Sequence, residues 1–483
     1  MQILKYPVRP IPILRYFGEL CTALAVLTLV PFLVSLFMAD WATAIRYAIV
    51  ASGVMALGLL LIRLPRSKQI QANEAMVVTV MIFVFTPLVL TWPTMLPGLS
   101  FSNALFESIS AITTTGLTTL NDVSGKPVTF LFARAWSQWV GGLGIVALSL
   151  AVMIQPGAAA KRLGDLEGYE TDPVGGTRAV IRRVFFTYAM ITAAGIVLLG
   201  CLGSGWFNAV IYTFAAVSTG GFSPHNASLA DMPGHWTPVW VTLISIAGAT
   251  PLLLYQRLRN KGWQAVVRDS QILTFLVAGL IFSFLLSATL WSQSGLVWPR
   301  AVYHGVLNAF SAQSTSGFST LNISGIDAAS KLILMISMSM GGCAGSTAGG
   351  IKILRLLIAL RILQLIVLRP GIPQNAVVRA QLDGRRLENS EIQNALCLVL
   401  AFFICIVLSW FPFVFMGYDP MNALFEVVSA LGTAGLTAGI SGPMLHPFLK
   451  GVLCMDMFLG RLEIFAWLVL FSPPTWFGKR MRE

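Results

Sequence analysis

Charged residues are scarce in this chain, and their scarcity excludes a water-soluble globule. Only 11% of the 483 residues are Asp, Glu, Lys or Arg, whereas 56% are hydrophobic. Soluble domains normally carry about 25% charged residues. The composition therefore places the chain in a lipid bilayer.

Cysteine and histidine are also sparse, with six and four residues. The cysteines show no CxxC spacing and the histidines are dispersed, so neither a disulfide framework nor a metal centre built from these side chains is predicted. HExxH, GxSxG and paired intramembrane aspartates are missing from the sequence. Because an intramembrane enzyme needs such a constellation, we expect a protein that is not an enzyme and holds no organic cofactor.

Acidic residues are fewer than basic ones, 20 against 32, and the basic residues lie in short clusters. They are spread over many loops without a nucleic-acid-binding motif, which argues against a nucleic-acid partner. In a ten-span arrangement the clusters all fall on one side, which the positive-inside rule makes the cytoplasm, with both termini there. The clusters are Lys5–Arg15, Arg63–Lys68, Lys161–Arg183, Arg257–Arg268, Lys352–Arg386 and Lys479–Arg482.

Apolar stretches of about 20 residues, enough to cross a ~30 Å hydrocarbon core, recur along the chain. The first is too long for a signal-peptide core and no small-residue cleavage pattern follows it, so we expect it to be retained. The ten predicted spans are 15–38, 42–62, 75–97, 129–154, 182–203, 236–256, 270–292, 330–368 (interrupted), 391–417 and 447–471.

A short Thr/Ser/Gly cluster occurs four times, each time after a similar apolar run such as NALFESISAI or NALFEVVSAL. The clusters are TTTGL (113–117), STGGF (218–222), STSGF (314–318) and GTAGL (432–436). Their closing glycines are 105, 96 and 118 residues apart, which is too long for a solenoid repeat and suits a small membrane module.

Each repeat has the same order: a spanning helix, a short helix, the cluster and a second spanning helix. The short segments 103–112, 206–217, 300–313 and 419–431 cannot span, so we expect re-entrant half-helices that enter from the outer side. Irregular backbone at membrane depth must be buried in protein or line water, so the four clusters should converge on one axis. The repeats are parallel, unlike the halves of an inverted-repeat transporter.

The predicted fold is therefore an all-α integral membrane protein with four parallel helix–pore-helix–helix repeats around a pseudo-fourfold pore. Residues 1–70 form two N-terminal transmembrane helices. The pore repeats occupy 71–160, 175–262, 268–370 and 388–483.

The clusters have the chemistry of a cation site. A half-helix directs its unpaired carbonyls and the negative end of its dipole toward the membrane centre, and rings of carbonyl oxygens can replace the hydration shell of potassium. Glycine is expected there because a backbone that presents consecutive carbonyls to one axis leaves the usual φ range. Small residues also allow close helix packing, which is the alternative explanation of these clusters. Because four clusters occur in the same register, we favour the cation site over helix packing.

Two further features stand out. The stretch GGCAGSTAGG (341–350) interrupts the last span of the third repeat; each internal glycine costs a helix about 1 kcal/mol against alanine, so we expect a loop, with a helix-packing seam as the alternative. In MDMFLGRLE (455–463), Arg461 lies near Asp456 and Glu463 within an apolar span. It could repel permeating cations or be neutralised by either carboxylate.

Two glutamates, Glu107 and Glu426, lie nine residues before the closing glycines of the first and fourth clusters. They either attract cations to the pore mouth or cap interhelical hydrogen bonds.

These residues resemble the Trk/Ktr/HKT superfamily of potassium transporters over essentially the full length, and the two extra N-terminal spans resemble its TrkH-type translocating subunit. The resemblance implies potassium uptake across a bacterial inner membrane, a homodimer, and a cytosolic nucleotide-binding partner of the TrkA type. Coupling to H+ or Na+, as in a secondary transporter, is the alternative mode.

The resemblance also implies roles for individual residues. Glycine at the first filter position, where sodium-selective plant relatives have serine, points to potassium. The implied filter residues are Thr114, Thr115, Gly116, Thr219, Gly220, Gly221, Thr315, Ser316, Gly317, Thr433, Ala434 and Gly435. The implied gating residues are Gly341, Gly342, Gly345, Gly349, Gly350, Lys352 and Arg461.

Overall fold

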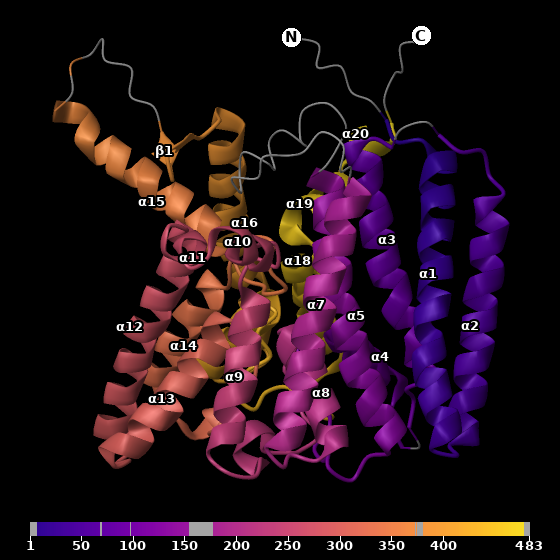
Figure 1. Cartoon of the computed structure of the whole chain (residues 1–483), viewed down its shortest axis with the longest axis horizontal. Coiled ribbons are helices and arrows are strands. Elements are labelled where there is room, and N and C mark those ends of the chain that lie inside the picture. The colour runs from indigo at the N-terminus through magenta and orange to yellow at the C-terminus, as the bar shows by residue number, and fades with distance from the viewer. Residues whose placement is uncertain are drawn as a thin grey trace.

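The computed structural model describes residues 7–67, 70–96, 98–153, 177–371, 373 and 380–477. Within these residues the chain is almost entirely helical, and most long helices run roughly along one direction (Figure 1). Six described helices are long and apolar enough to cross a membrane. They are α1 (Pro10–Phe37), α2 (Trp41–Ile62), α3 (Ala72–Thr91), α7 (Thr177–Cys201), α12 (Ser270–Gln293) and α16 (Asn389–Phe415).

The first two helices form a closely packed pair at the edge of the bundle (Figure 1). A Cβ atom on Gly18 would lie 2.6 Å from Leu61 Cβ, so the absence of a side chain allows the two backbones to approach. Asp40 begins α2 by accepting a hydrogen bond from Thr43 N, and it also accepts one from Thr129 Oγ1 at 2.7 Å. These contacts fix the pair against the first repeat.

The short helices of the four repeats end at the predicted residues. They are α4 (Phe101–Ile112), α8 (Trp206–Val217), α13 (Trp298–Gln313) and α17 (Pro420–Leu431). Figure 1 shows α4, α8 and α13 toward the end of the bundle opposite α20 (Pro473–Trp476). Each short helix is followed by a further α-helix of its repeat. In chain order these helices are α5 (Val128–Met153), α9 (Trp236–Ala249), α14 (Ala328–Met340) and α18 (Pro447–Arg461).

Two of the predicted spans are broken. The span predicted at 236–256 is helical only to Ala249, because Thr250 precedes Pro251 and a residue before proline is driven out of the helical region. The chain continues as α10 (Leu254–Lys261) and α11 (Gln264–Val267). The span predicted at 447–471 breaks at Leu462, between α18 and α19 (Glu463–Phe471).

The interrupted third-repeat span is confirmed, since α14 ends at Met340 and α15 (Ile353–Leu368) begins twelve residues after Gly341. A small hairpin that the sequence analysis did not predict lies before α16. It pairs β1 (Gln381–Leu382) with β2 (Arg385–Arg386) through Asp383 and Gly384, whose φ angles of +51° and +76° suit a two-residue hairpin turn. The remaining elements are η1 (Ser228–Asp231), η2 (Ile323–Gly325) and η3 (Arg369–Gly371).

The two ends of the described chain meet at one end of the bundle. Val8 N donates a hydrogen bond to Thr475 O at 2.9 Å, and Arg9 forms an ion pair with the buried Glu74 at 2.6 Å. The predicted basic cluster Lys479–Arg482 and most of Lys161–Arg183 lie outside the described residues.

Candidate functional site

Each short helix ends in the same backbone motif. In the first repeat Thr114 N donates to Ala111 O at 3.1 Å and Thr115 N donates to Ser110 O at 2.9 Å, the paired bonds of a Schellman cap. The bonds equivalent to the second one are Gly220 N to Ala215 O, Ser316 N to Ser311 O and Ala434 N to Ser429 O, at 2.7, 2.9 and 2.8 Å.

A threonine, and not only the closing glycine, has a left-handed backbone in every repeat. The φ angles are +52° at Thr114, +53° at Thr219, +51° at Thr315 and +48° at Thr433. The expected left-handed glycines are confirmed at the ring, where φ is +91°, +79°, +71° and +81° at Gly116, Gly221, Gly317 and Gly435, and the four threonines share this region although their Cβ disfavours it. Such a conformation costs on the order of 1–3 kcal/mol and persists only where the surroundings enforce it.

The four closing glycines form a closed ring. A Cβ atom on Gly116 would lie 2.1 Å from Gly220 O, the carbonyl that precedes the glycine of the second repeat. A Cβ atom on each of the other three glycines would also meet a carbonyl oxygen of the next repeat. The distances are 2.3 Å from Gly221 to Ser316 O, 2.4 Å from Gly317 to Ala434 O and 2.0 Å from Gly435 to Thr115 O. The predicted convergence of the four clusters on one axis is confirmed, and a side chain at any ring glycine would strike a carbonyl oxygen.

Nine residues before each ring glycine, a polar side chain ties the short helix to the segment after the ring. The buried Glu107 accepts from Thr119 N at 2.6 Å and pairs with Arg134 at 2.9 Å. The buried Glu426 accepts from Ala438 N at 3.0 Å. These contacts favour the capping role for both carboxylates. The equivalent Asn308 accepts from Thr320 N at 3.1 Å, and the Tyr212 hydroxyl lies 3.0 Å from Ser223 Oγ.

The stretch 341–350 leaves the helix as predicted and packs against the ends of three short helices. Thr347 Oγ1 donates to Val217 O, the last residue of α8, at 3.0 Å. Gly349 N donates to Thr315 Oγ1 at 2.8 Å, and a Cβ on Gly349 would lie 2.3 Å from Gly432 O at the end of α17. The loop therefore lies directly beneath the glycine ring, on the side of the helix C-termini.

Hydrogen bonds to its neighbours hold this loop in place. Cys343 N donates to Ala249 O at 3.0 Å, Thr347 N donates to Gly248 O at 3.2 Å, and Gln313 Nε2 donates to Gly341 O at 3.0 Å. A helical packing seam, the alternative reading, is wrong because the backbone is not helical. Four of the predicted gating residues have left-handed φ angles, which are +68° at Gly341, +75° at Gly345, +76° at Gly350 and +72° at Lys352. Another of them, Gly342, accepts a hydrogen bond at its carbonyl from Ile353 N at 3.0 Å.

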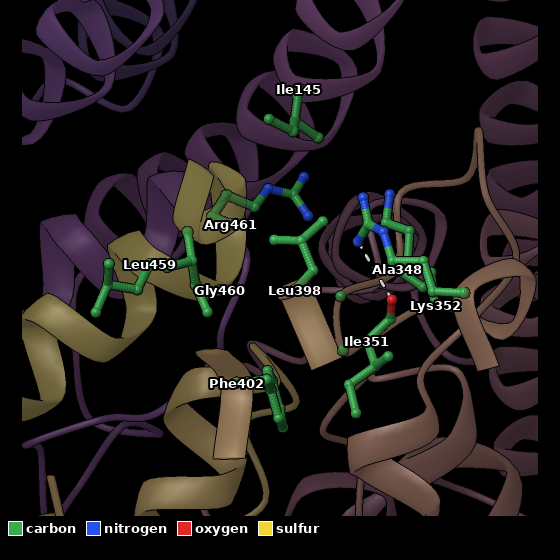
Figure 2. Close-up of a pocket in the computed structure, with 13 residues that line it drawn as sticks. Ile145, Ala348, Ile351, Lys352, Leu398, Phe402, Leu459, Gly460 and Arg461 are labelled. Atoms are coloured by element: carbon green, nitrogen blue, oxygen red, sulfur yellow. Dashed lines mark hydrogen bonds between the residues drawn. The ribbon is translucent and has the colours of Figure 1, made fainter. Parts of the chain in front are cut away.

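Arg461 connects the loop to the first repeat. Its side chain is 4% exposed; Nη1 donates to Thr347 O at 2.7 Å and Nη2 donates to Gly141 O at 3.1 Å. Gly141 packs against the end of α4, since a Cβ there would lie 2.0 Å from Ile112 O. Arg461 and Lys352 both line a cavity below the loop, and Figure 2 shows the Arg461 side chain extending toward the side where Ala348 and Lys352 lie.

The predicted neutralisation of Arg461 by Asp456 is wrong. Asp456 accepts a hydrogen bond from Ser409 Oγ of α16 at 2.6 Å, because its position on α18 turns it toward α16. No carboxylate with a described side chain forms an ion pair with Arg461. The side chain of Glu463, the other predicted partner, lies outside the described residues.

Two buried lysines that were not predicted from the sequence join neighbouring repeats. Lys450 Nζ on α18 donates to Asn103 Oδ1 on α4 at 2.6 Å, and Lys331 Nζ on α14 donates to Asn422 Oδ1 on α17 at 2.8 Å. A lysine within an apolar segment was the available signal, because an ammonium group in a membrane interior needs a polar partner.

These features define a class: an all-α, multi-pass membrane protein whose four re-entrant half-helices direct their carbonyl ends to one axis. The family model for TrkH, described as a cation transport protein, matches residues 43–476. The chain therefore belongs to the TrkH family, which consists of transporters and not of enzymes.

Relatives and a solved structure agree with this assignment. The chain is 31% identical to the Trk system potassium uptake protein TrkH of Escherichia coli, over 79% of this chain and 80% of that protein. It is 30% identical to TrkH of Halomonas elongata over 96% and 98% of the two chains. The crystal structure of the potassium transporter TrkH from Vibrio parahaemolyticus matches the fold with a TM-score of 0.85 and 23% identity, over 97% of this chain and all of that one.

Proposed function

We propose that this chain takes up potassium ions through the glycine ring. The observation that carries the proposal is the cyclic contact of each ring glycine with the carbonyl of the next repeat. Four backbone carbonyls around one axis are the type of ligand that replaces potassium hydration. The relatives named as potassium uptake proteins support the same ion.

The four half-helices supply the electrostatics of this proposed filter. Their C-termini meet below the ring, and each terminus carries the negative end of a helix dipole, so a dehydrated cation is stabilised there without a carboxylate ligand. In this proposal the permeant ion is the only ligand. Its carbonyl contacts come from Thr114, Thr115, Gly116, Thr219, Gly220, Gly221, Thr315, Ser316, Gly317, Thr433, Ala434 and Gly435.

The loop 341–350 and Arg461 form the proposed gate. The loop occupies the space beneath three half-helix ends, where an ion leaving the ring has to pass. The Arg461 guanidinium bonds to the loop and to Gly141 O beside the end of α4, the half-helix of the first repeat, so its positive charge opposes the passage of a cation. Conduction therefore requires the loop and Arg461 to move together.

The same proposal covers the membrane, the oligomeric state and the partner protein of this chain. We place the chain in a bacterial inner membrane as a homodimer with both termini in the cytoplasm, and with a cytosolic nucleotide-binding partner of the TrkA type that moves the loop. The naming of the relatives as parts of a Trk system supports a multi-component assembly. The pore repeats 71–160, 175–262, 268–370 and 388–483 are its proposed domains. The alternative, uptake coupled to H+ or Na+, predicts flux that depends on a gradient of the coupling ion.

Ion flux into liposomes that contain the purified chain tests this proposal, with potassium, rubidium, sodium and lithium compared. Gly317→Ser places a Cβ 2.4 Å from Ala434 O, so we expect potassium-over-sodium discrimination to fall about tenfold, the effect of ~1.4 kcal/mol of lost differential binding. Gly295→Ser is the matched control, because Gly295 has φ of +65° but no atom within 4 Å of its Cβ position. Equal ion ratios in the parent and in Gly317→Ser would contradict the filter assignment.

A further inference from the structure

The second repeat departs from the others at the residue before its ring glycine. Gly220 occupies the position that is Thr115, Ser316 or Ala434 in the other repeats, all of which carry a Cβ. A Cβ on Gly220 would lie 2.5 Å from Cδ of Gln138. Gln138, on α5 of the first repeat, therefore occupies the space that a side chain at Gly220 would need.

Gln138 binds the backbone on both sides of the ring glycine Gly221. Its Nε2 donates to Gly220 O at 2.6 Å, and its Oε1 accepts from Phe222 N at 3.2 Å. The side chain is fully buried, so these two bonds do not compete with water. Both hydrogen-bonding ends of one amide are used on consecutive peptide groups of the ring.

The carbonyl that Gln138 binds is one of the four ring carbonyls, and it differs from the other three in accepting a hydrogen bond from a side chain. Gly220 O is the atom that a Cβ on Gly116 would strike. Within the described part of the chain, the other three ring carbonyls accept no hydrogen bond from a side chain. Those three are Thr115 O, Ser316 O and Ala434 O.

Arg134, one helical turn before Gln138 on α5, contacts the same segment of the second repeat. Its guanidinium lies 3.7 Å from the centre of the Phe222 ring and is held by Glu107 at 2.9 Å. Side chains four residues apart lie on one face of a helix. One face of α5 therefore fixes the second repeat's ring segment from the first repeat.

We infer that Gln138 is a specificity-determining positioning residue that sets the direction and distance of the Gly220 carbonyl in the ring. The inference rests on the proposed function of the ring as the potassium filter. A carbonyl fixed by a short hydrogen bond cannot move inward around a smaller ion, so sodium loses coordination that a free carbonyl would supply. Gln138 thereby replaces, from the neighbouring repeat, the side chain that Gly220 lacks.

Replacement of Gln138 by Met, which is similar in length but lacks the amide, tests this inference in proteoliposomes. Of the two lost bonds, the one to the ring carbonyl Gly220 O bears on ion preference, so we expect a roughly 3- to 10-fold fall in the potassium-to-sodium flux ratio, the size of one buried hydrogen bond, while potassium flux itself persists. Ser245→Ala is the matched control, because Ser245 is a buried polar residue on α9 whose hydroxyl bonds only within its own helix, to Val241 O at 3.0 Å.

A compensating pair of substitutions separates positioning from general stability. Gly220→Ala alone should disrupt the ring and lower the flux ratio, because its Cβ meets Gln138. The double change Gly220→Ala with Gln138→Ala should restore folding and a ratio above that of Gly220→Ala, since it removes the side chain that the new Cβ would meet.

The outcomes distinguish this inference from the proposed filter itself. An unchanged ratio in Gln138→Met beside a lowered ratio in Gly317→Ser overturns the role of Gln138 and leaves the filter in place. An equal loss of flux for all four cations, with lower thermal stability and no change of ratio, also overturns it. Unchanged ratios in both variants overturn the filter assignment.

Discussion

Threonine hydroxyls connect the proposed filter to the proposed gate. At the strained left-handed positions, Thr315 Oγ1 accepts from Gly349 N, and Thr219 Oγ1 lies 3.4 Å from Thr347 Oγ1. Glycine would adopt this backbone with less strain, but it would have no hydroxyl to meet the loop. The loop contacts give a physical reason for threonine at these two positions.

Arg461 is the single residue whose removal tests the electrostatic barrier. We expect Arg461→Ala to raise cation flux, because it removes both a positive charge and the two bonds that hold the loop to α18 and α5. Arg461→Lys keeps the charge and should therefore stay closer to the parent. Flux of both variants and of the parent, measured in the same liposomes, checks this expectation.

Asp456→Asn is the control for the barrier. Asp456 bonds to Ser409 and not to Arg461, so its change should leave flux unaltered. Flux of Arg461→Ala that never exceeds the parent value would rule out a barrier role.

At the scale of the element, hydrogen bonds to several neighbouring elements hold the loop 341–350, the proposed gate. Its backbone bonds to the end of α9, its Thr347 hydroxyl bonds to the end of α8, and Arg461 holds Thr347 O. Glycine permits the left-handed turns that this path requires, as at Gly341, where a Cβ would lie 2.1 Å from Gly349 O. The many small residues therefore serve close packing of a loop beneath the ring.

Thr347→Val should loosen the loop while leaving the ring glycines and their carbonyls in place, since its contact with the filter is only the long one to Thr219 Oγ1 at 3.4 Å. Valine has the shape of threonine but cannot donate to Val217 O or Gly248 O, both 3.0 Å away. The one hydroxyl proton makes a single bond shared between these carbonyls, worth about 0.5–1.5 kcal/mol, so we expect basal flux in the absence of any partner to rise by up to about tenfold with an unchanged ion preference.

Ser346→Ala provides the matched control, because the Ser346 hydroxyl donates within the loop to Cys343 O. Deletion of residues 344–348 should raise basal flux further. Low flux in a correctly folded deletion variant would show that the loop does not obstruct the pore.

At the scale of the whole molecule, contacts between repeats close the ring. Lys450 joins the fourth repeat to the first across 347 residues of sequence, and Lys331 joins the third to the fourth. Gln138 and Arg134 join the first to the second. The ring geometry therefore depends on polar groups buried between repeats.

The Lys450–Asn103 contact predicts unequal effects of its two substitutions. Asn103→Leu leaves a buried ammonium without that partner and should lower the free energy of unfolding by roughly 1.5–3 kcal/mol. Lys450→Met removes the charge and leaves only the neutral acceptors Asn103 Oδ1 and Pro443 O without this donor, so its cost should be smaller than that of Asn103→Leu. Thermal unfolding of both purified variants in one detergent measures the difference. Equal destabilisation would contradict the argument.

The sequence by itself determined the number of repeats, their parallel direction, the C-terminal residues of all four short helices and the break at 341–350. These features depend on local periodicity, glycine content and length, which are properties of short segments. The residues of the proposed filter were implied by the family resemblance, which the four equally spaced clusters carry, and not by the local pattern alone.

Only the tertiary structure decided which side chains meet between repeats. Gln138 with Gly220, Lys450 with Asn103 and Asp456 with Ser409 are pairs 82, 347 and 47 residues apart. No local pattern encodes them, since they arise from the rotation and depth at which helices pack. The hydroxyl partners of Thr219 and Thr315 were likewise decided by the tertiary structure, because Thr347 and Gly349 belong to the loop of the third repeat.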